Sequence, residues 1–167
     1  MSRLLKSVAL VALLSAAPAS AKDADYIDNR SSAEDVVISY YNAISHGQFA
    51  RAFSYGLRAA PLETQVELDA AFEAFGDGYT DVEQIRVRLG TPLSDAGAGG
   101  EMAAIPVILQ TRDSAGGKTV EAACHYLTQL SPSAQDAVPF EPIRIERTSR
   151  QVINGEFATV DMPDCSF

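Results

Sequence analysis

The 167-residue chain has no tryptophan, two cysteines and two histidines. Protein zinc sites take three or four ligands, mostly from cysteine, histidine and carboxylate side chains, and His46 and His125 are far apart in the sequence. Neither Cys124 nor Cys165 has the nearby second cysteine of a C-x-x-C redox motif. We therefore expect no metal site and no cofactor.

Positive charge is also scarce. The chain has 13 Lys and Arg residues against 22 Asp and Glu residues, which gives a formal net charge of -9. Surfaces that bind nucleic acids or anionic membranes carry clustered positive charge. We therefore expect neither a nucleic acid nor a membrane surface as a partner.

The chain lacks an apolar run of the roughly 20 residues that cross a bilayer as a helix. Its apolar start is short: residues 8–14 follow the basic residues Arg3 and Lys6 and precede a small-residue segment that ends at Ala21. This order is typical of a cleavable secretory signal peptide, and the alternative is a buried N-terminal helix. A signal over residues 1–21 predicts a secreted, periplasmic protein. Because no cysteine follows the site, we expect no lipid or other membrane anchor.

The rest of the chain divides into two parts. Residues 22–30 are polar and show no periodicity, so we expect a flexible leader there. Residues 31–167 have the size of one domain. Two cysteines in an oxidising compartment are expected to pair. A disulfide between Cys124 and Cys165 would close a loop of about 40 residues and stabilise the fold by about 3–4 kcal/mol.

Residues 31–57 predict two amphipathic helices. Ser31 and Glu34 have the spacing of a capping box at the start of the first helix. His46 is expected to cap its end, and Gly47 is free to adopt the positive φ that ends a helix. The residues expected on buried faces are Val36, Val37, Tyr40, Tyr41 and Ile44 in the first helix and Phe49, Ala52, Phe53 and Leu57 in the second.

A third helix is expected from Pro61, which suits a first-turn position, to Gly76. Its apolar stripe would include Leu62, Val66, Ala70 and residues 72–75, opposite an acidic face. Four strands should follow, and Pro106 within the second argues for a sheet edge or a bulge. The expected strands are residues 79–89, 101–112, 119–130 and 143–152, with a loop at 91–100.

Alternation along these strands assigns the faces of the sheet. We expect His125 to lie on the outer face with Glu121 and Gln129. Helices followed by antiparallel strands predict an α+β domain, with the helices on one side of a curved sheet. The strand residues expected to face the helices are Ile85, Val87, Leu89, Ala103, Ile105, Val107, Leu109, Val120, Ala122, Cys124, Tyr126, Ile143 and Ile145.

The run VVISYYNAI at residues 36–44, followed by Gly47, Phe49, Ala52 and Phe53, resembles the opening of the NTF2-like superfamily, which includes SnoaL-like and ketosteroid-isomerase-like proteins. The resemblance implies a cone, in which N-terminal helices pack on a strongly bent antiparallel sheet around a pocket. It does not imply a reaction, because this fold carries both enzymes and non-catalytic domains. The implied pocket residues are Tyr40, Tyr41, Phe53, Val107 and Tyr126.

The resemblance also lets the enzyme hypothesis be tested residue by residue. In the ketosteroid-isomerase-like branch a tyrosine of the first helix stabilises an oxyanion, and Tyr40 matches it, with Tyr41 as the neighbouring choice. The carboxylate base of that branch has no counterpart at residues 55–61, and an oxyanion donor without a base supports little turnover. Dehydratase-like members need inward histidines, which His125 is not expected to supply. Tyr40 and Tyr126 remain as candidates for catalysis, although both are more simply packing residues.

We therefore expect an exported NTF2-like domain that binds a molecule rather than transforming one. The ligand would be a small apolar or amphipathic molecule in the cone, or a protein partner, including a second copy docked through the sheet face. One alternative is a SnoaL-like or ketosteroid-isomerase-like enzyme acting on a small hydrophobic substrate. Another is a subunit of a cell-envelope complex.

Overall fold

The computed structural model describes residues 25–56, 64–97, 99–136 and 140–167. Within these ranges three helices precede a five-stranded antiparallel sheet, and a short 3-10 helix, Pro132–Ala134, lies before the last strand. The helices are α1 (Ala33–Ser45), α2 (Phe49–Ser54) and α3 (Gln65–Asp77). The strands are β1 (Val82–Leu89), β2 (Leu93–Gly97), β3 (Gly100–Asp113), β4 (Lys118–Leu130) and β5 (Arg144–Val152). The expected signal peptide, Leu57, Pro61 and Leu62 lie outside the described residues.

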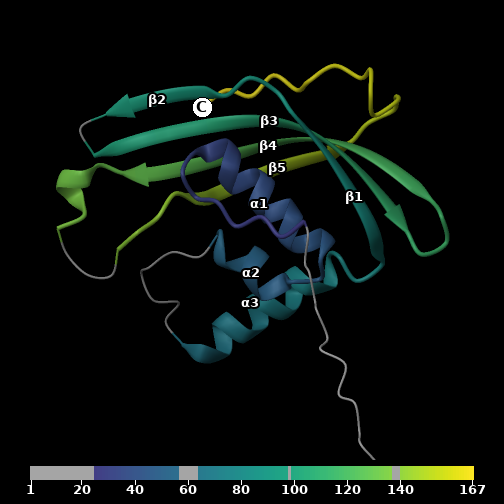
Figure 1. Cartoon of the computed structure of the whole chain (residues 1–167), viewed down its shortest axis with the longest axis horizontal. Coiled ribbons are helices and arrows are strands. Elements are labelled where there is room, and N and C mark those ends of the chain that lie inside the picture. The colour runs from purple at the N-terminus through teal and green to yellow at the C-terminus, as the bar shows by residue number, and fades with distance from the viewer. Residues whose placement is uncertain (1–24, 57–63, 98, 137–139) are drawn as a thin grey trace, which may run out of the picture.

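The sheet has the order β1-β3-β4-β5, and β2 pairs with the part of β3 that β1 leaves free. Figure 1 shows α1 lying against one side of the curved sheet, with α2 and α3 farther from it. Three helices packed on one side of a bent antiparallel sheet form the architecture of an NTF2-like α+β domain. The predicted fold class is therefore confirmed.

The strand β2 was not expected, because residues 91–100 are rich in Gly, Pro, Ser and Asp. All five of its residues are exposed, so it exists through its pairing with β3 rather than through burial. Pro106 was expected at an edge or a bulge. The edge is wrong, because Pro106 lies within β3 and is paired opposite Cys124 of β4 without a break in register. On its other side the register shifts by one residue between the pairs Leu89–Val107 and Leu93–Ala104, so Pro106 lies at an irregularity of the pairing. Gly90 N donates there to Pro106 O at 2.8 Å.

The helix α1 begins one residue later than its expected capping box. Ser32, not Ser31, is the N-cap, and its hydroxyl accepts a hydrogen bond from Asp35 N at 3.1 Å. At the other end His46 is the C-cap, as expected, and Gly47 has a φ of 65°. A residue with a β-carbon is strained at this φ, which explains the glycine at the turn between α1 and α2.

The main core lies between α1 and the sheet. Val36, Val37 and Ile44 of α1 pack on the odd-numbered residues of β3, and these faces were assigned correctly. The face of β4 was assigned the wrong way round. Ala123, His125 and Leu127 lie toward the helices, whereas the even-numbered residues of this strand lie on the outer face. Alternation failed because β4 is covered on both sides and both of its faces are apolar.

The outer face of β3 and β4 is covered by residues 153–167 (Figure 1). Phe157 packs against Ile108 and Ala122 there. Cys165 forms the expected disulfide with Cys124, with the two Cα atoms 5.8 Å apart and a sequence separation of 41. This segment occupies part of the face through which a second copy was expected to dock, and that homodimer stays a prediction.

The helix α3 starts with a complete capping box, formed by Thr64 and Glu67. None of its side chains is fully buried, and Val66, which was expected on its apolar stripe, is 76% exposed. Phe75 packs against the core from its last turn. Of the helices that the structure describes, none combines the length and the apolar character of a membrane span.

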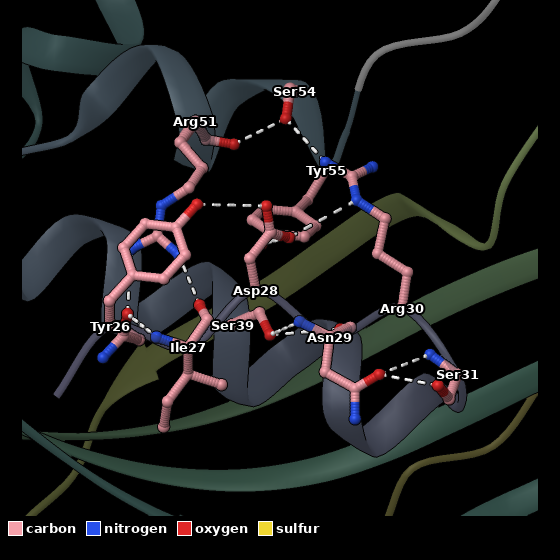
Figure 2. Close-up of polar contacts among 11 residues, drawn as sticks. Tyr26, Ile27, Asp28, Asn29, Arg30, Ser31, Ser39, Arg51, Ser54 and Tyr55 are labelled. Atoms are coloured by element: carbon pink, nitrogen blue, oxygen red, sulfur yellow. Dashed lines mark hydrogen bonds and ion pairs between the residues drawn. The ribbon is translucent and has the colours of Figure 1, made fainter.

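Residues 25–31, here called the N-terminal segment, are attached to α1 and α2 (Figure 2). Ile27 N donates to Asn42 Oδ1 at 3.0 Å, and Asn29 N donates to Ser39 Oγ at 2.8 Å. Residues 25–30 of the expected leader make such contacts, and the flexibility expected of the leader stays a prediction. These contacts are not visible in the sequence because they are polar and backbone-directed, without the hydrophobic periodicity that identifies a helix or a strand.

Candidate functional site

The adjacent residues Tyr40 and Tyr41 on α1 point to different neighbours. Their rings meet edge to face, with centroids 4.9 Å apart. Tyr41 is 2% exposed and lies in the core against β4, whereas Tyr40 is only partly buried. Each tyrosine hydroxyl begins a separate chain of hydrogen bonds, and Arg150 connects the two chains.

The inner chain joins α1 to two strands. The hydroxyl of Tyr41 lies 2.7 Å from Nε2 of His125, and Nδ1 of the same ring lies 2.8 Å from Oγ1 of Thr148 on β5. Burial, assisted by the nearby positive charge of Arg150, lowers the pKa of His125 to about 3. The imidazole is therefore neutral at pH 7, so that one ring nitrogen donates and the other accepts.

The outer chain joins α1 to the turn after α3 and to β5. The hydroxyls of Tyr40 and Tyr79 are 3.0 Å apart, and Nη2 of Arg150 donates to the Tyr79 hydroxyl at 3.1 Å. Arg150 is exposed, but its guanidinium contacts the Tyr79 hydroxyl at the edge of the core. Partial loss of hydration lowers the pKa of the guanidinium, and the neighbouring oxygens of Tyr41 and Tyr79 and the carboxylate of Glu121 outweigh this effect and raise it. We call Tyr40, Tyr41, Tyr79, His125, Thr148 and Arg150 the polar cluster.

A group of aromatic rings adjoins the polar cluster. The ring of Phe75 lies 5.3 Å from that of Tyr79 and 5.6 Å from that of Phe53, and the rings of Phe53 and Phe72 are 5.5 Å apart. Phe53 and Phe75 are partly exposed, and Phe72 is 37% exposed. Large apolar side chains that are exposed together are informative about function. We call Phe49, Phe53, Phe72 and Phe75, together with Tyr40 and Tyr79, the ring cluster.

The end of β5 extends this region. Val152 lies two residues beyond Arg150 and therefore on the same face of the strand, and it is 70% exposed. Its cross-strand neighbour is Glu121 on β4. The region therefore presents apolar rings, an exposed aliphatic side chain, one cation and several hydroxyls within a short distance.

The structure brings together only part of the expected pocket. Tyr40 and Phe53 belong to the ring cluster and are partly exposed. Tyr41 and Val107 are core residues, with exposures of 2% and 0%, and cannot line an open pocket. Tyr126 lies on the other face of the sheet, beside the disulfide and under the guanidinium of Arg147. Tyr40 and Tyr126 cannot act on one substrate, because the sheet separates them.

Sequence reasoning missed four residues of the polar cluster. His125 was placed on the outer face, and this correction brings it 2.7 Å from Tyr41. Tyr79 was expected at the start of a strand, but it is a buried turn residue before β1. Alternation could not find Thr148 and Arg150, because counting on from Ile145 places even positions outside, and the register shift between Tyr126 and Leu127 reverses the face of β5.

A separate cavity of about 200 Å³ lies at the other end of α1. Ser32 and Glu34 line it from the helix start, and Ala103 and Leu127 line it from the sheet. Pockets that enclose small organic ligands usually measure about 300–1,000 Å³, so this cavity is small by that standard. Two hollows reach that size, one of about 650 Å³ beside Gly90, Pro106 and Met162 and one of about 350 Å³ over β2, β3 and β4, but both are open to solvent. We prefer the ring cluster and the polar cluster as the candidate site because they combine aromatic rings with a cation and hydroxyls. Within the described part of the chain, no group of three His, Cys, Asp or Glu side chains could hold a metal ion.

Two solved structures are similar to this one. A proposed dehydratase of the NTF2-like family from Streptomyces avermitilis aligns with a TM-score of 0.48 and 10% identity, over 72% of this chain and 93% of that chain. The CaMKII hub of S. rosetta aligns with a TM-score of 0.45 and 12% identity, over the same shares. No protein-family model and no curated protein matches this chain.

Proposed function

We propose that this protein is an exported NTF2-like domain that binds a small amphipathic molecule and leaves it chemically unchanged. The observation that carries the proposal is the ring cluster, whose aromatic rings contact one another while remaining partly exposed beside the polar cluster. Exposed aromatic surface next to fixed polar groups is typical of ligand sites. The apolar part of the ligand would lie against Phe53, Phe72 and Phe75.

Binding is favoured over catalysis because the polar cluster offers no general base suited to neutral pH. Both ring nitrogens of His125 have hydrogen-bond partners, and its pKa of about 3 makes it a weak base. Burial raises the pKa of Tyr40 and of Tyr41, so neither is ionised at neutral pH. The carboxylate of Glu121 interacts electrostatically with the guanidinium of Arg150.

Export is supported by the order of basic, apolar and small residues over residues 1–21 and by the buried disulfide. Disulfides persist mainly in oxidising compartments such as the periplasm. The test is the intact mass of the protein recovered from a periplasmic extract. A mature chain that starts at Lys22 supports export with cleavage, whereas retention of residues 1–21 in the cytoplasmic fraction contradicts it.

The binding proposal is tested by titrating the ¹³C-labelled aromatic rings with the neutral probe 4-phenylbutanamide and following the shifts by NMR. We expect saturable shifts at the phenylalanines of the ring cluster. Phe72→Ala should weaken binding about fivefold or more, because burying a ring against the ligand contributes roughly 1–2 kcal/mol. Val66→Ala, on the same helix but 76% exposed, is the matched control and should leave the affinity unchanged.

Two results would contradict the proposal. One is the absence of saturable shifts at the ring cluster with all three of the following probes: the phenylbutyl, cyclohexylbutyl and octyl amides. The other is an equal loss of affinity in Phe72→Ala and Val66→Ala, which would indicate unspecific adsorption to the surface of α3.

A further inference from the structure

We propose that the polar cluster receives a carboxylate, so that the ligand is a small monocarboxylic acid with an apolar body. This inference rests on the proposed function and identifies the chemical class of the ligand. Three observations support it. The cluster leaves hydrogen-bond donors unused, the charge of Arg150 has no carboxylate at ion-pair distance among the described residues, and Tyr79 belongs to both clusters.

The outer chain has more donors than acceptors. Arg150 donates to the Tyr79 oxygen, and the hydroxyls of Tyr40 and Tyr79 share one contact at 3.0 Å. Two hydroxyl hydrogens are present for that one contact. Whichever tyrosine donates, the hydroxyl hydrogen of the other has no acceptor among the residues that the structure describes.

The inner chain gives the same result. Tyr41, His125 and Thr148 supply two hydroxyl hydrogens and one ring N–H, and they make two hydrogen bonds with one another. With Nδ1 protonated, the unused hydrogen is on Thr148, which is exposed; with Nε2 protonated, it is on Tyr41, which is 2% exposed. In the first tautomer each chain of hydrogen bonds leaves one donor that a ligand can reach, and a group that complements the cluster has to be an acceptor.

Arg150 carries a charge that no carboxylate in the described ranges meets at ion-pair distance. Arg144, on the same strand, has two such partners, Glu141 at 2.7 Å and Glu146 at 3.2 Å. The guanidinium of Arg150 instead interacts with the hydroxyls of Tyr79 and Tyr41. Because these contacts use neutral oxygens, the guanidinium retains the capacity to bind an anion, and carboxylates match its planar geometry.

The position of Tyr79 determines how such a ligand would lie. Its hydroxyl contacts Arg150, and its ring lies 5.3 Å from that of Phe75. A carboxylate at Arg150 therefore places the adjoining carbon chain beside Phe75 and the rest of the ring cluster. The charge of Glu121 near Arg150 favours a monoanion, because a second negative charge on the ligand would meet repulsion.

The experiment compares two probes that differ only in the polar group, 4-phenylbutyrate and 4-phenylbutanamide, by calorimetry and NMR at pH 7.5. We expect the acid to bind about tenfold or more tightly than the amide. Arg150→Gln should reduce that ratio to about threefold or less, because it removes the positive charge that distinguishes the acid from the amide. Arg147→Gln is the matched control, because Arg147 is on the same strand but contacts Tyr126 on the opposite face.

A second variant protects the test from a failure of folding. Tyr40→Phe removes one hydroxyl from the half-buried end of the outer chain, and it should weaken binding of the acid more than binding of the amide. Thermal unfolding of each variant identifies any that is not folded.

The outcomes separate the two proposals. Equal affinities of acid and amide, with saturable shifts at the ring cluster, overturn the carboxylate inference and leave the proposed function standing. Binding of neither probe overturns the inference, and the proposed function falls with it when the cyclohexylbutyl and octyl amides also fail to bind. The inference is also overturned if Arg147→Gln reduces the ratio of acid to amide affinity as much as Arg150→Gln does. That result would assign the preference for the acid to the overall positive charge of the strand.

Discussion

The hydroxyl of Tyr41 on α1 lies 2.7 Å from Nε2 of His125 on β4, and the two residues are 84 positions apart in the sequence. Their exposures are 2% and 1%, so water cannot replace either partner. This hydrogen bond fixes the first helix to the middle of the sheet. It also makes the polar cluster part of the core, and changes in it are expected to affect stability as well as binding.

Tyr41→Phe should destabilise the protein by about 1–3 kcal/mol, because it leaves a buried ring nitrogen of His125 without its partner. The matched control is Tyr40→Phe, whose hydroxyl lies in a partly exposed pair with Tyr79. We expect a loss below about 1 kcal/mol for that change. Urea unfolding followed by far-UV circular dichroism measures both values. Equal losses in the two variants would contradict the assignment of Tyr41 to the buried chain.

Stability should fall as the pH drops below about 6.5. Burial lowers the pKa of His125 from its ordinary value of 6.5 to about 3. Between these values the unfolded chain binds a proton that the folded protein does not, so acid favours unfolding, with a slope of about 1.4 kcal/mol per pH unit. The stability that depends on a neutral His125 ring is fully present above pH 6.5. Urea midpoints measured from pH 7.5 to pH 5 test it.

The chain has only two histidines, which gives this prediction a matched control. His125→Gln should flatten the dependence on pH between 7.5 and 5, whereas His46→Gln should keep it. A wild-type protein whose stability is constant over this range would show that His125 is not buried as a neutral ring.

The part of the fold that could be predicted depends on how strongly each segment is patterned. The positions of α1 and β3 follow from apolar residues at helical or alternating spacing, because a single buried face produces that spacing. The orientation of β4 could not be predicted, since residues 122–127 are apolar or aromatic on both faces. His125 was therefore placed outside, although it lies in the core.

The site was harder to predict than the fold. Tyr40 and Phe53 were found because they share the apolar pattern of the helices. Tyr79 and Arg150 lie 71 residues apart, and only the curvature of the sheet brings them within 3.1 Å of each other. Curvature arises from strand pairing and from changes of partner such as the one at Pro106, and a single sequence carries no direct record of it.

The N-terminal segment should detach when the carboxylate of Asp28 is removed. The hydroxyl of Tyr55 donates to it at 2.5 Å, and this hydrogen bond is the main reason why the pKa of Asp28 lies below its ordinary value of 3.8. The stabilisation is therefore present above pH 3.8 and is lost as the pH falls through the lower folded value. Asp28→Asn should speed hydrogen exchange at the amides of Ile27 and Asn29.

Hydrogen-exchange mass spectrometry measures this effect, with Asp25→Asn as the control. The side chain of Asp28 is 35% exposed, so we expect a loss of global stability of no more than about 1 kcal/mol. Unchanged exchange at both amides in Asp28→Asn would contradict the role of this carboxylate, whereas an equal effect of Asp25→Asn would point to net charge instead.

The disulfide should contribute about 3–4 kcal/mol, the value that loop closure gives for cysteines with a sequence separation of 41. The double variant Cys124→Ala with Cys165→Ala should lose this amount in urea unfolding. Thiol labelling of the native protein should modify neither cysteine before reduction. Labelling of both cysteines in the untreated protein would contradict the pairing.

The passage from β1 to β2 places a strict steric requirement on one position. A β-carbon at Gly90 would lie 3.0 Å from Cβ of Pro106 and 3.2 Å from Cγ of Met162. Any larger residue there would press at the same time on the central strand and on the segment that carries Cys165. The corner of the sheet and the C-terminal covering are thus mechanically linked through a residue that has no side chain, and a deep mutational scan should find position 90 less tolerant than positions 76 and 97, where an added β-carbon meets nothing within 4 Å.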